Sequence, residues 1–462
     1  IQIADRNESI NALGILPVYS LTGSLTQVAV RTAVKQALAK AEQYLPETLP
    51  ASIITERQLP DRYTALKNIH FPGSFAKLAE AKKRFIFEEL FLLQCGLLYY
   101  RDRIKEVRQG IKHGVDGKLV TAVKNSLPFE LTEAQQKAWQ EISLDMQDNK
   151  PMHRLLQGDV GSGKTVVSAL ALAKTVENGY QGCIMVPTEI LAQQHFETLT
   201  EYLGKQGLRV ELLTSSVKKA KRREILENLE LGEIDVLVGT HALIQDDVVF
   251  ARLALVVTDE QHRFGVKQRE KLYQKGKEPH VLAMSATPIP RTLALILYGD
   301  MDLSVIDERP ANRLPIKNCA VNTDYRPNAY RFMLKQIEEG RQVYIICPMV
   351  EQDDESELES VMLYTEELKS QFPPSVTIEY LHGKMKPAQK EDIMARYAEG
   401  EIDILVSTTV IEVGIDVPNA SVIMIENAER FGLAQLHQLR GRVGRGEWQS
   451  YCILMSTKET KE

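Results

Sequence analysis

The chain has 462 residues, with 62 acidic and 56 basic side chains and a formal net charge of −6. Its hydrophobic fraction of 44% and charged fraction of 26% are typical of a globular protein, and the length predicts about two to four domains. The slightly negative charge excludes an overall basic field, so any contact with nucleic acid must come from local grooves.

Apolar stretches and cysteines indicate whether the chain crosses a membrane and whether it contains disulfides. The longest apolar stretch, residues 90–100, contains Gln94 and is too short to span a bilayer. The five cysteines form no C-x-x-C pair, and three of them lie in apolar, strand-like runs: Cys183, Cys347 and Cys452, the others being Cys95 and Cys319. This pattern predicts reduced core thiols of a cytosolic protein, not metal ligands or disulfides.

The N-terminal part is predicted to be mainly helical. One helical pattern runs from Ser24, a candidate N-cap, to about Tyr44, and a longer one runs from Ser74 to about Gly110. The apolar stripe of the longer helix predicts a face that packs on a neighbouring domain, with a partner-binding groove as the alternative. Residues 114–125 predict a loop-rich connection, and we find no internal repeat.

A phosphate-binding loop is predicted between a short strand candidate, residues 154–157, and a helix start at residue 166. The pattern G-x-x-x-x-G-K-[ST] is matched without a mismatch by Gly158, Asp159, Val160, Gly161, Ser162, Gly163, Lys164 and Thr165. Backbone N–H groups and the helix N-terminus would hold phosphate oxygens, Lys164 would contact the β- and γ-phosphates, and the Thr165 hydroxyl would bind Mg²⁺. The alternative is a glycine-rich turn without a ligand.

Beyond residue 125 short β-branched runs alternate with helical segments, which predicts parallel α/β sheets. The strand candidates fall in two series: Cys183–Val186, Val236–Gly239, Ala254–Thr258 and Val281–Ser285, then Gln342–Pro348, Ile404–Ser407 and Val422–Ile425. We therefore expect two doubly wound α/β domains, residues 126–314 and 315–462, that face each other and follow a helical segment at residues 17–125. Ligands of such sheets bind beyond the carboxyl ends of the strands.

An acidic pair follows the apolar run that ends at residue 258. Asp259 is placed to hold Mg²⁺, directly or through water, and Glu260 to polarise the water that attacks the γ-phosphate. An exposed acidic turn is the alternative. Gln261 and His262 are candidates for coupling the nucleotide to another partner, and so are Ser285 and Thr287 at another strand end, although that signal alone is weak.

An arginine-rich turn follows in the second half, at residues 438–445. Because arginine suits bidentate phosphate contacts, Arg442 and Arg445 would complete a hydrolytic site when the two domains close. A solvated basic turn is the alternative. Short polar turns after strands carry Thr188, Thr240 with His241, and Thr408 with Thr409. A basic cluster at residues 218–223 either attracts phosphate or is a solvated helix start.

The ordered strings GDVGSGKT, PTE, GTH, DEQH, SAT, TTVIEVGID and QLRGRVGR together resemble the motifs of superfamily 2 helicases. The longer strings DEQHRFGVKQR, ATPIPRTLA, HGKMKPAQK and LAQLHQLRGRVGRG are similar to those of the RecG family of bacterial branched-DNA helicases, from about residue 16 to the end. This resemblance implies RecA-like domains with ATP and Mg²⁺ as cofactors. It also implies that Phe129 packs on the adenine and that Gln135 hydrogen-bonds to it.

The resemblance assigns further roles. It implies catalysis by Lys164, Glu260, Gln438, Arg442 and Arg445, with Gly414 and Asp416 facing the nucleotide. Backbone contacts to DNA would come from Thr188, Thr240, His241, His382, Thr408 and Thr409. Members of the family also carry an N-terminal OB-fold wedge domain and continue beyond the arginine motif, so residues 1–16 would be the tail of that wedge.

The implied function is that of an ATP-dependent double-stranded-DNA translocase. It would remodel stalled forks and Holliday junctions in recombination and repair, as a monomer in the bacterial cytoplasm beside the nucleoid. Single-stranded-DNA-binding protein is a candidate partner. A translocase like the transcription-repair coupling factor is one alternative, and a non-catalytic scaffold that binds ATP and DNA is another.

Overall fold

The computed structural model describes residues 15–107, 109–286, 301–308, 314–348, 354–383, 385–408, 417–444 and 446–457. The chain divides into two compact units, residues 1–103 and 104–462. We expected the helical segment to continue to residue 125. The boundary between the two units instead lies near residue 103. The region predicted to be loop-rich contains a helix, α5 (Lys118–Ser126), which buries Val120 and Val123 completely in the core of the second unit.

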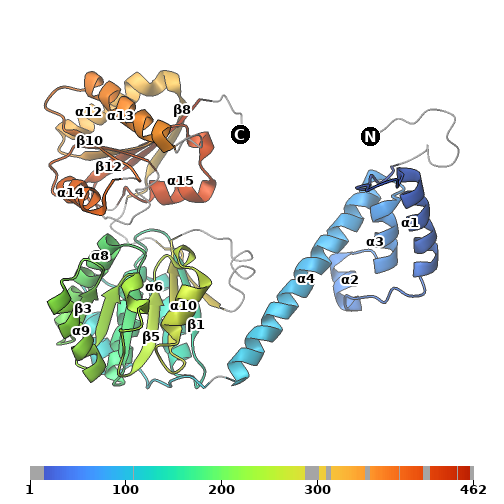
Figure 1. Ribbon diagram of the computed structural model, residues 1–462, viewed down its shortest axis with the longest axis horizontal. Coiled ribbons are helices and arrows are strands. Elements are labelled where there is room, and N and C mark those ends of the chain that lie inside the picture. Colours follow the sequence, from blue (N-terminus) through green and yellow to red (C-terminus); the bar gives the residue numbers. More distant parts are fainter. Residues whose placement is uncertain are drawn as a thin grey trace. The chain divides into compact units, whose positions relative to one another are not determined.

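The first unit is helical, as predicted. It contains α1 (Gln27–Ala41), α2 (Ala51–Arg57), α3 (Arg62–His70) and most of α4 (Phe75–Val107). Figure 1 shows the three shorter helices beside the N-terminal half of α4. The hydroxyl of Thr26, not of Ser24, caps α1 by accepting a hydrogen bond from the Ala29 N–H. Side chains of the predicted apolar stripe, among them Leu90 and Leu93, are exposed.

A buried cation holds the first unit together. The Arg84 side chain on α4 is completely buried and forms ion pairs with Glu47 and, at 3.1 Å, with Glu88. Glu47 precedes α2 and also accepts backbone hydrogen bonds from Leu49 and Arg62. Because a buried guanidinium is tolerated only when it is paired, this pair of carboxylates fixes the loop before α2 onto the long helix.

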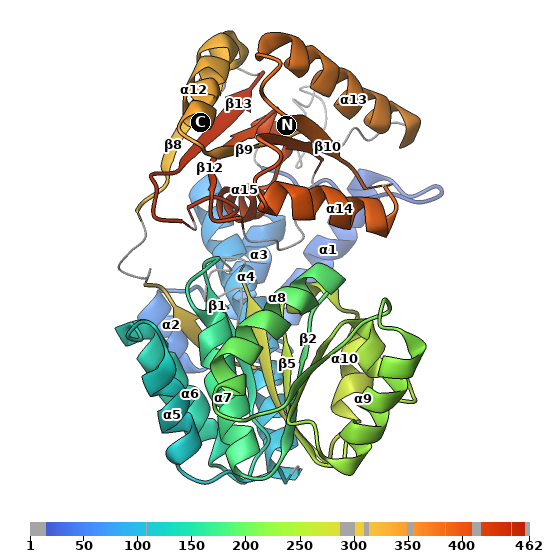
Figure 2. The ribbon, with the colours of Figure 1, turned by 90° about the vertical axis from the view of Figure 1, so that its left-hand side faces the viewer.

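The first sheet of the second unit has seven strands, all paired in parallel in the order β3-β4-β2-β5-β6-β1-β7. Their bounds are β1 (His153–Gly158), β2 (Gln181–Met185), β3 (Val210–Leu213), β4 (Val236–Gly239), β5 (Leu253–Thr258), β6 (His280–Ser285) and β7 (Asp302–Ile306). The helices are α5, α6 (Glu133–Met146), α7 (Lys164–Glu177), α8 (Glu189–Leu199), α9 (Lys219–Leu231) and α10 (Val266–Tyr273), which cover both faces of the sheet (Figure 2).

The second sheet has six strands, also all parallel, in the order β10-β11-β9-β12-β13-β8. They are β8 (Lys317–Asn322), β9 (Gln342–Ile346), β10 (Ile378–Leu381), β11 (Ile404–Ser407), β12 (Ala420–Ile425) and β13 (Tyr451–Ser456). Its helices are α12 (Arg326–Glu338), α13 (Asp354–Gln371), α14 (Pro387–Ala398) and α15 (Leu433–Arg440). Strand residues alternate between the two cores: Tyr344 packs with α14 and α15, and Val343 and Ile345 pack with α12 and α13.

The prediction of two doubly wound domains is confirmed. Each strand that was predicted lies within two residues of its observed bounds. The strands β3, β7, β8, β10 and β13 were not predicted. Four of these five lie at the sheet edges, and β8 is largely exposed, so that it lacks the apolar run that identifies a buried strand.

The two sheets share a local structural motif at the ends of β5 and β12. After β5 and after β12 the chain passes through a left-handed residue, Glu260 (φ 50°) or Asn427 (φ 48°). A short 3₁₀ turn and a new helix follow, η3 (Gln261–Arg263) with α10 and η6 (Ala428–Arg430) with α15. Both helices follow a glycine whose N–H donates to a glutamine, Gln268 or Gln435, at 3.1 Å. The shared letters R-F-G-x-x-Q are too few to stand out along the sequence.

Candidate active site

The predicted phosphate-binding loop joins the end of β1 to the first residue of α7. Gly161 (φ 74°) and Gly163 (φ 92°) adopt the left-handed conformation, which turns the backbone of the loop. The Lys164 Nζ donates to the carbonyl oxygens of Gly158 at 2.8 Å and of Asp159 at 2.9 Å. The buried Ser162 hydroxyl finds no hydrogen-bond partner within the described part of the chain. A lysine at the cradle and an unsatisfied donor fit a phosphate ligand.

Gln135, on α6, hydrogen-bonds to the backbone of this loop. Its Oε1 accepts from the Thr132 N–H at 3.0 Å, which completes a capping box at the start of α6, and its Nε2 donates to the Ser162 carbonyl at 2.7 Å. A Cβ at Gly163 would collide with the Gln135 amide. The glycine is therefore required both by its φ and by this close approach.

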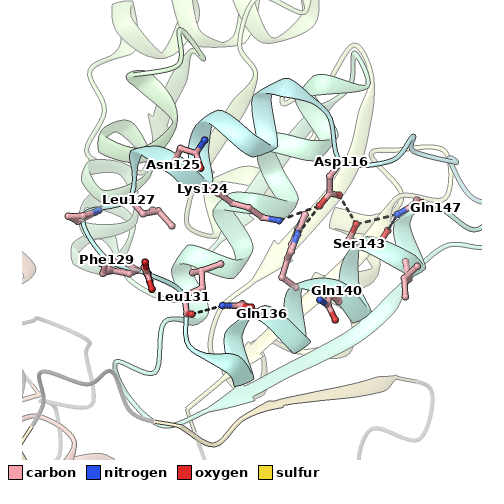
Figure 3. Close-up of a pocket in the computed structure, with 14 residues that line it drawn as sticks. Asp116, Lys124, Asn125, Leu127, Phe129, Leu131, Gln136, Gln140, Ser143 and Gln147 are labelled. Carbon is pink, nitrogen blue, oxygen red and sulfur yellow. Dashed lines mark hydrogen bonds and ion pairs between the residues drawn. The ribbon is translucent and has the colours of Figure 1, made fainter.

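Phe129 lines a cavity of about 930 Å³ beside α6, together with Leu127, Leu131, Gln136 and Gln140 (Figure 3). Phe129 is 45% exposed. Gln135, by contrast, is buried against the phosphate-binding loop. The structure thus does not bring the two predicted base-reading side chains into one cavity, and their roles stay predictions.

Asp259 follows β5, as predicted, and is held on three sides. Its N–H donates to the Met185 carbonyl at 3.0 Å, its Oδ1 accepts from the Glu260 N–H at 3.0 Å, and its Oδ2 lies 2.9 Å from the Nε2 of His195. Burial alone would raise the pKa of Asp259, but the hydrogen bond and charge of His195, with the charge of Lys164, lower it. The carboxylate is therefore ionised and available to a cation.

Glu260 has a different environment. It adopts a left-handed backbone conformation that costs a non-glycine residue about 1–2 kcal/mol. Burial, followed by the negative charge of Asp259, raises the pKa of Glu260 to about 7, and the charges of Lys164 and Arg442 oppose this shift. A carboxylate whose pKa lies near neutrality is suited to accept a proton.

The end of α15 brings the second domain to this site. Arg442, 8% exposed, lies close enough for its charge to act on Glu260. The His437 Nε2 lies 2.8 Å from the Asp159 Oδ1, and Gly441 packs on Val160, whose Cγ2 would be 3.0 Å from a Cβ there. The structure therefore brings Lys164, Glu260 and Arg442 together. Gln438 is half-buried on α15.

Sequence reasoning missed His195 and His437. Both contact predicted site residues, but from helices far away in the chain, and a lone histidine in a helical pattern carries no signal by itself. Several predicted positions lie outside the described residues: Thr287, Thr409, Gly414, Asp416 and Arg445. The side chain of His262 is likewise not described.

Two of the coupling candidates are buried. Gln261 is 2% exposed, and neither its amide oxygen nor its nitrogen has a hydrogen-bond partner among the described residues. Ser285, at the end of β6, is 3% exposed. A buried polar group without a hydrogen-bond partner destabilises the fold by on the order of 1–3 kcal/mol, and the Gln261 amide has two such groups. A rearrangement that supplies partners for them would therefore be favourable.

The predicted DNA-contacting residues that the structure describes lie at the carboxyl ends of strands or just beyond. Thr188 is partly exposed and caps α8, His241 is exposed, and His382 is partly exposed. Thr240 and Thr408 are buried, and their hydroxyls have no partner within the described ranges. These two would contact DNA only after the surrounding loops move.

The basic cluster at the start of α9 is largely neutralised. Arg222 pairs with Asp247 at 2.7 Å, Arg223 with Glu227 at 2.8 Å, and Lys221 with an acid of its own helix. These pairs favour the solvated helix start over a phosphate-binding patch. In this part of the chain Lys218 and Lys219 remain as exposed cations.

The predicted Mg²⁺ ligands fit a site that the nucleotide completes. Thr165 is the second residue of α7, and Asp259 is an ionised carboxylate. Among the described residues no group of three or more histidine, cysteine, aspartate or glutamate side chains would hold a metal without other ligands. Mg²⁺ commonly binds through one or two protein oxygens plus substrate phosphates. Nor does the described part contain a helix long and apolar enough to cross a membrane.

Comparisons with known proteins agree with this geometry. The DEAD/DEAH box helicase family matches residues 132–296, and the helicase conserved C-terminal domain family matches residues 328–447. The ATP-dependent DNA helicase RecG of Bacillus subtilis is 48% identical over 447 residues, which are 97% of this chain and 66% of the relative. That of Thermotoga maritima is 47% identical over 441 residues, 96% of this chain and 56% of the relative.

Solved structures give the same result. A structure of RecG bound to a three-way DNA junction shares 43% sequence identity with a TM-score of 0.78, over 97% of this chain and 59% of that chain. The helicase MrfA bound to DNA, 18% identical with a TM-score of 0.56, shares the fold alone. The chain spans between 56% and 66% of the length of the two curated relatives. From its two helicase domains and its similarity to RecG over nearly every residue, the chain belongs to the RecG family of superfamily 2 helicases.

Proposed function

We propose that this chain is the motor part of an ATP-dependent double-stranded-DNA translocase that remodels branched DNA such as stalled forks and Holliday junctions. The observation that carries the proposal is the meeting of Lys164, Glu260 and Arg442 at one site, where the charge of Arg442 from the second domain acts on Glu260 of the first. The similarity to a RecG bound to a three-way DNA junction supports the branched substrate.

The residues of the chain divide the work of hydrolysis. The loop N–H groups and Lys164 bind the phosphates of ATP, and Thr165 and Asp259 hold Mg²⁺, which neutralises charge on the phosphate oxygens when bound. Glu260 orients the attacking water and accepts its proton. Arg442, with Arg445 as predicted, stabilises the charge that develops on the phosphoryl group. Gln438 is assigned to the same catalytic surface.

DNA contacts are assigned to the carboxyl ends of the strands. The exposed His241 and the partly exposed Thr188 and His382 are accessible to a backbone, and the unsatisfied hydroxyls of Thr240 and Thr408 fit groups that find a partner when DNA binds. Such contacts position DNA without reading its sequence. Gln261 and Ser285 would then carry the change to the nucleotide. We further propose that the protein acts as a monomer in the bacterial cytoplasm beside the nucleoid, with single-stranded-DNA-binding protein as a partner.

One experiment separates the alternatives. ATP hydrolysis is measured without DNA, with linear duplex and with a forked duplex of equal length, and Lys164→Ala serves as the inactive control. A RecG-type motor hydrolyses ATP and is stimulated most by the fork. Equal stimulation by linear duplex would favour a motor like the transcription-repair coupling factor. Binding of ATP and fork without turnover would favour a scaffold and overturn the proposal.

A further inference from the structure

A histidine that the proposed reaction does not use lies directly against the metal carboxylate. His195 is on α8, roughly two turns beyond the Thr188 cap, and is 6% exposed. Its Nε2 lies 2.9 Å from the Oδ2 of Asp259. In the part of the chain that the structure describes, the hydrogen bonds to this carboxylate come from His195 and from the Glu260 N–H.

The other ring nitrogen of His195 argues against a purely structural role for this side chain. The Nδ1 of His195 is buried and has no hydrogen-bond partner among the described residues. Leaving a buried polar atom unsatisfied costs on the order of 1–3 kcal/mol, so an apolar residue of similar size would suit the core better. The imidazole is present despite this unfavourable free energy, and its one described hydrogen bond is with Asp259.

The position of His195 along α8 links two sites. Thr188 accepts a hydrogen bond from the Leu191 N–H at the start of the helix, where we assign a DNA contact. Ala192, His195 and Leu199 form the buried face of the same helix, and because close-packed elements shift as units we expect the helix to move as one body. A displacement of its first turn therefore moves the imidazole, and with it the Oδ2 of Asp259.

We propose that His195 is a positioning residue that holds Asp259 in the orientation that Mg²⁺ requires and couples this orientation to DNA at the start of α8. The coupling half of the proposal rests on the proposed function, and the metal half does not. Mg²⁺ demands near-ideal octahedral geometry, and partners that orient a ligand commonly change metal affinity about 10- to 100-fold. An Asp259 carboxylate without the imidazole is free to rotate about its side-chain bonds.

The test compares three variants. His195→Leu fills the space without a donor, His195→Gln keeps an N–H donor, and Gln193→Ala alters an exposed neighbour on α8 as the matched control. The first readout is binding of a fluorescent ADP analogue, titrated with Mg²⁺ and also in excess chelator. The second is the Mg²⁺ dependence of ATP hydrolysis with and without forked duplex. The third is the affinity for that duplex, and thermal unfolding checks the fold.

The expected results distinguish the two halves. In His195→Leu the half-saturating Mg²⁺ concentration rises about 10- to 100-fold, nucleotide affinity in chelator and DNA affinity stay as in the unmodified chain, and DNA stimulates hydrolysis less. His195→Gln recovers part of both effects, and Gln193→Ala shows neither. If His195→Leu does not fold, His195→Asn, whose shorter amide cannot span the gap, replaces it with the same expectation.

An unchanged Mg²⁺ requirement in His195→Leu, or in His195→Asn where that variant replaces it, would overturn the positioning role. A shifted Mg²⁺ requirement with undiminished stimulation by DNA would overturn the coupling. If forked DNA fails to stimulate even the unmodified chain, the proposed function fails, whereas the Mg²⁺ titration still decides the role of His195.

Discussion

At the scale of single residues, the site is made of groups in costly states. Glu260 has a left-handed backbone, and Gln261 buries an amide without partners in the described structure. Thr240 and Thr408 bury unsatisfied hydroxyls in the same way, within the ranges described. Each such feature costs on the order of 1–3 kcal/mol, and the surrounding sheets must supply that stability. The cost is concentrated at the carboxyl ends of strands, where the function requires groups that change partners.

The first prediction concerns Glu260. Glu260→Gln removes the group that accepts the proton but keeps the side-chain size, so ATP binding should be retained while kcat falls on the order of a hundredfold or more. Nucleotide titration and steady-state hydrolysis measure the two quantities. Near-normal turnover would exclude Glu260 from this role. Glu270→Gln, an exchange on the exposed part of α10, is the control.

The second prediction separates the lysine from the arginine. In the proposed site Lys164 contacts phosphates in the ground state, so Lys164→Ala should weaken nucleotide binding itself. In the same proposal Arg442 acts on charge that develops in the transition state, so Arg442→Ala should lower kcat roughly a thousandfold with little change in affinity. We expect the same of Arg445→Ala. A loss of affinity alone in either arginine variant would disprove the cross-domain role of that residue.

At the scale of elements, the chain before α5 is fastened to the first sheet by two buried histidines. His280, at the start of β6, accepts from the Met152 N–H at 2.9 Å through Nδ1, so its Nε2–H donates to the Ile111 carbonyl at 2.6 Å. The ring of His113 lies against it, with centroids 4.9 Å apart. This arrangement requires a neutral His280.

The third prediction is a dependence of stability on pH. Burial, above all, lowers the pKa of His113 and of His280 to about 4. Below an unfolded pKa of about 6.5 the unfolded chain binds more protons at these two rings than the folded one, so their contribution to the free energy of unfolding falls as pH drops from about 6.5 to 4 and is constant above that window. The raised pKa of Glu260 contributes in the opposite direction over much of the same range, so the effect of the rings is isolated by substitution. One ring contributes on the order of 3 kcal/mol at most.

Urea unfolding followed by tryptophan fluorescence at pH 7.5 and pH 5 measures this effect. His113→Asn removes one titrating ring and should reduce the difference between the two pH values. His241→Asn changes an exposed histidine and should leave the difference in stability between the two pH values unchanged. A difference in stability between the two pH values that is as large in His113→Asn as in the unmodified chain would contradict the burial of neutral rings.

Elements also show why the sequence predicted part of the structure. The phosphate-binding loop and the Asp259–Glu260 pair were predictable because their chemistry requires fixed residues at short spacing after a strand. The contacts of His195 and His437 join positions 64 and 278 residues apart, a separation that the pattern of one segment does not encode. The helix α5 was missed because its nine residues bury few apolar side chains, Val120 and Val123.

At the scale of the whole molecule, six of the seven strands of the first sheet correspond in order to the six strands of the second, and among the described strands only β7 is left over. The series β3-β4-β2-β5-β6-β1 parallels β10-β11-β9-β12-β13-β8, and the phosphate-binding loop after β1 therefore corresponds to the turn after β8. That turn, residues 323–325, contains no glycine and leads directly into α12. Lys164 begins α7, whereas Arg326 begins α12.

An ion pair takes the place that a nucleotide has in the first domain. Arg326 binds Glu426, the counterpart of Asp259, at 2.8 Å, and Tyr364 donates to the same carboxylate at 2.9 Å. The Glu426 side chain is 5% exposed and that of Arg326 is 35% exposed. The counterpart of Glu260, the proposed proton acceptor, is Asn427, which cannot accept a proton. The second domain thus has the same strand and helix arrangement as the first, but its own Arg326 and Tyr364 side chains occupy the carboxylate at the corresponding position.

The last prediction follows from this asymmetry. One nucleotide should bind per chain, and Lys164→Ala should abolish binding, as measured by calorimetric titration of ADP with Mg²⁺. Arg326→Ala should open no second site. It should instead lower the free energy of unfolding by about 2–3 kcal/mol, because it leaves the buried Glu426 without a counter-charge, while the partial exposure of Arg326 limits the loss. Adding Glu426→Gln should recover part of that stability, since the unpaired charge is then removed. Two nucleotides per chain, or an unaltered stability of Arg326→Ala, would show that the second domain is not closed by this ion pair.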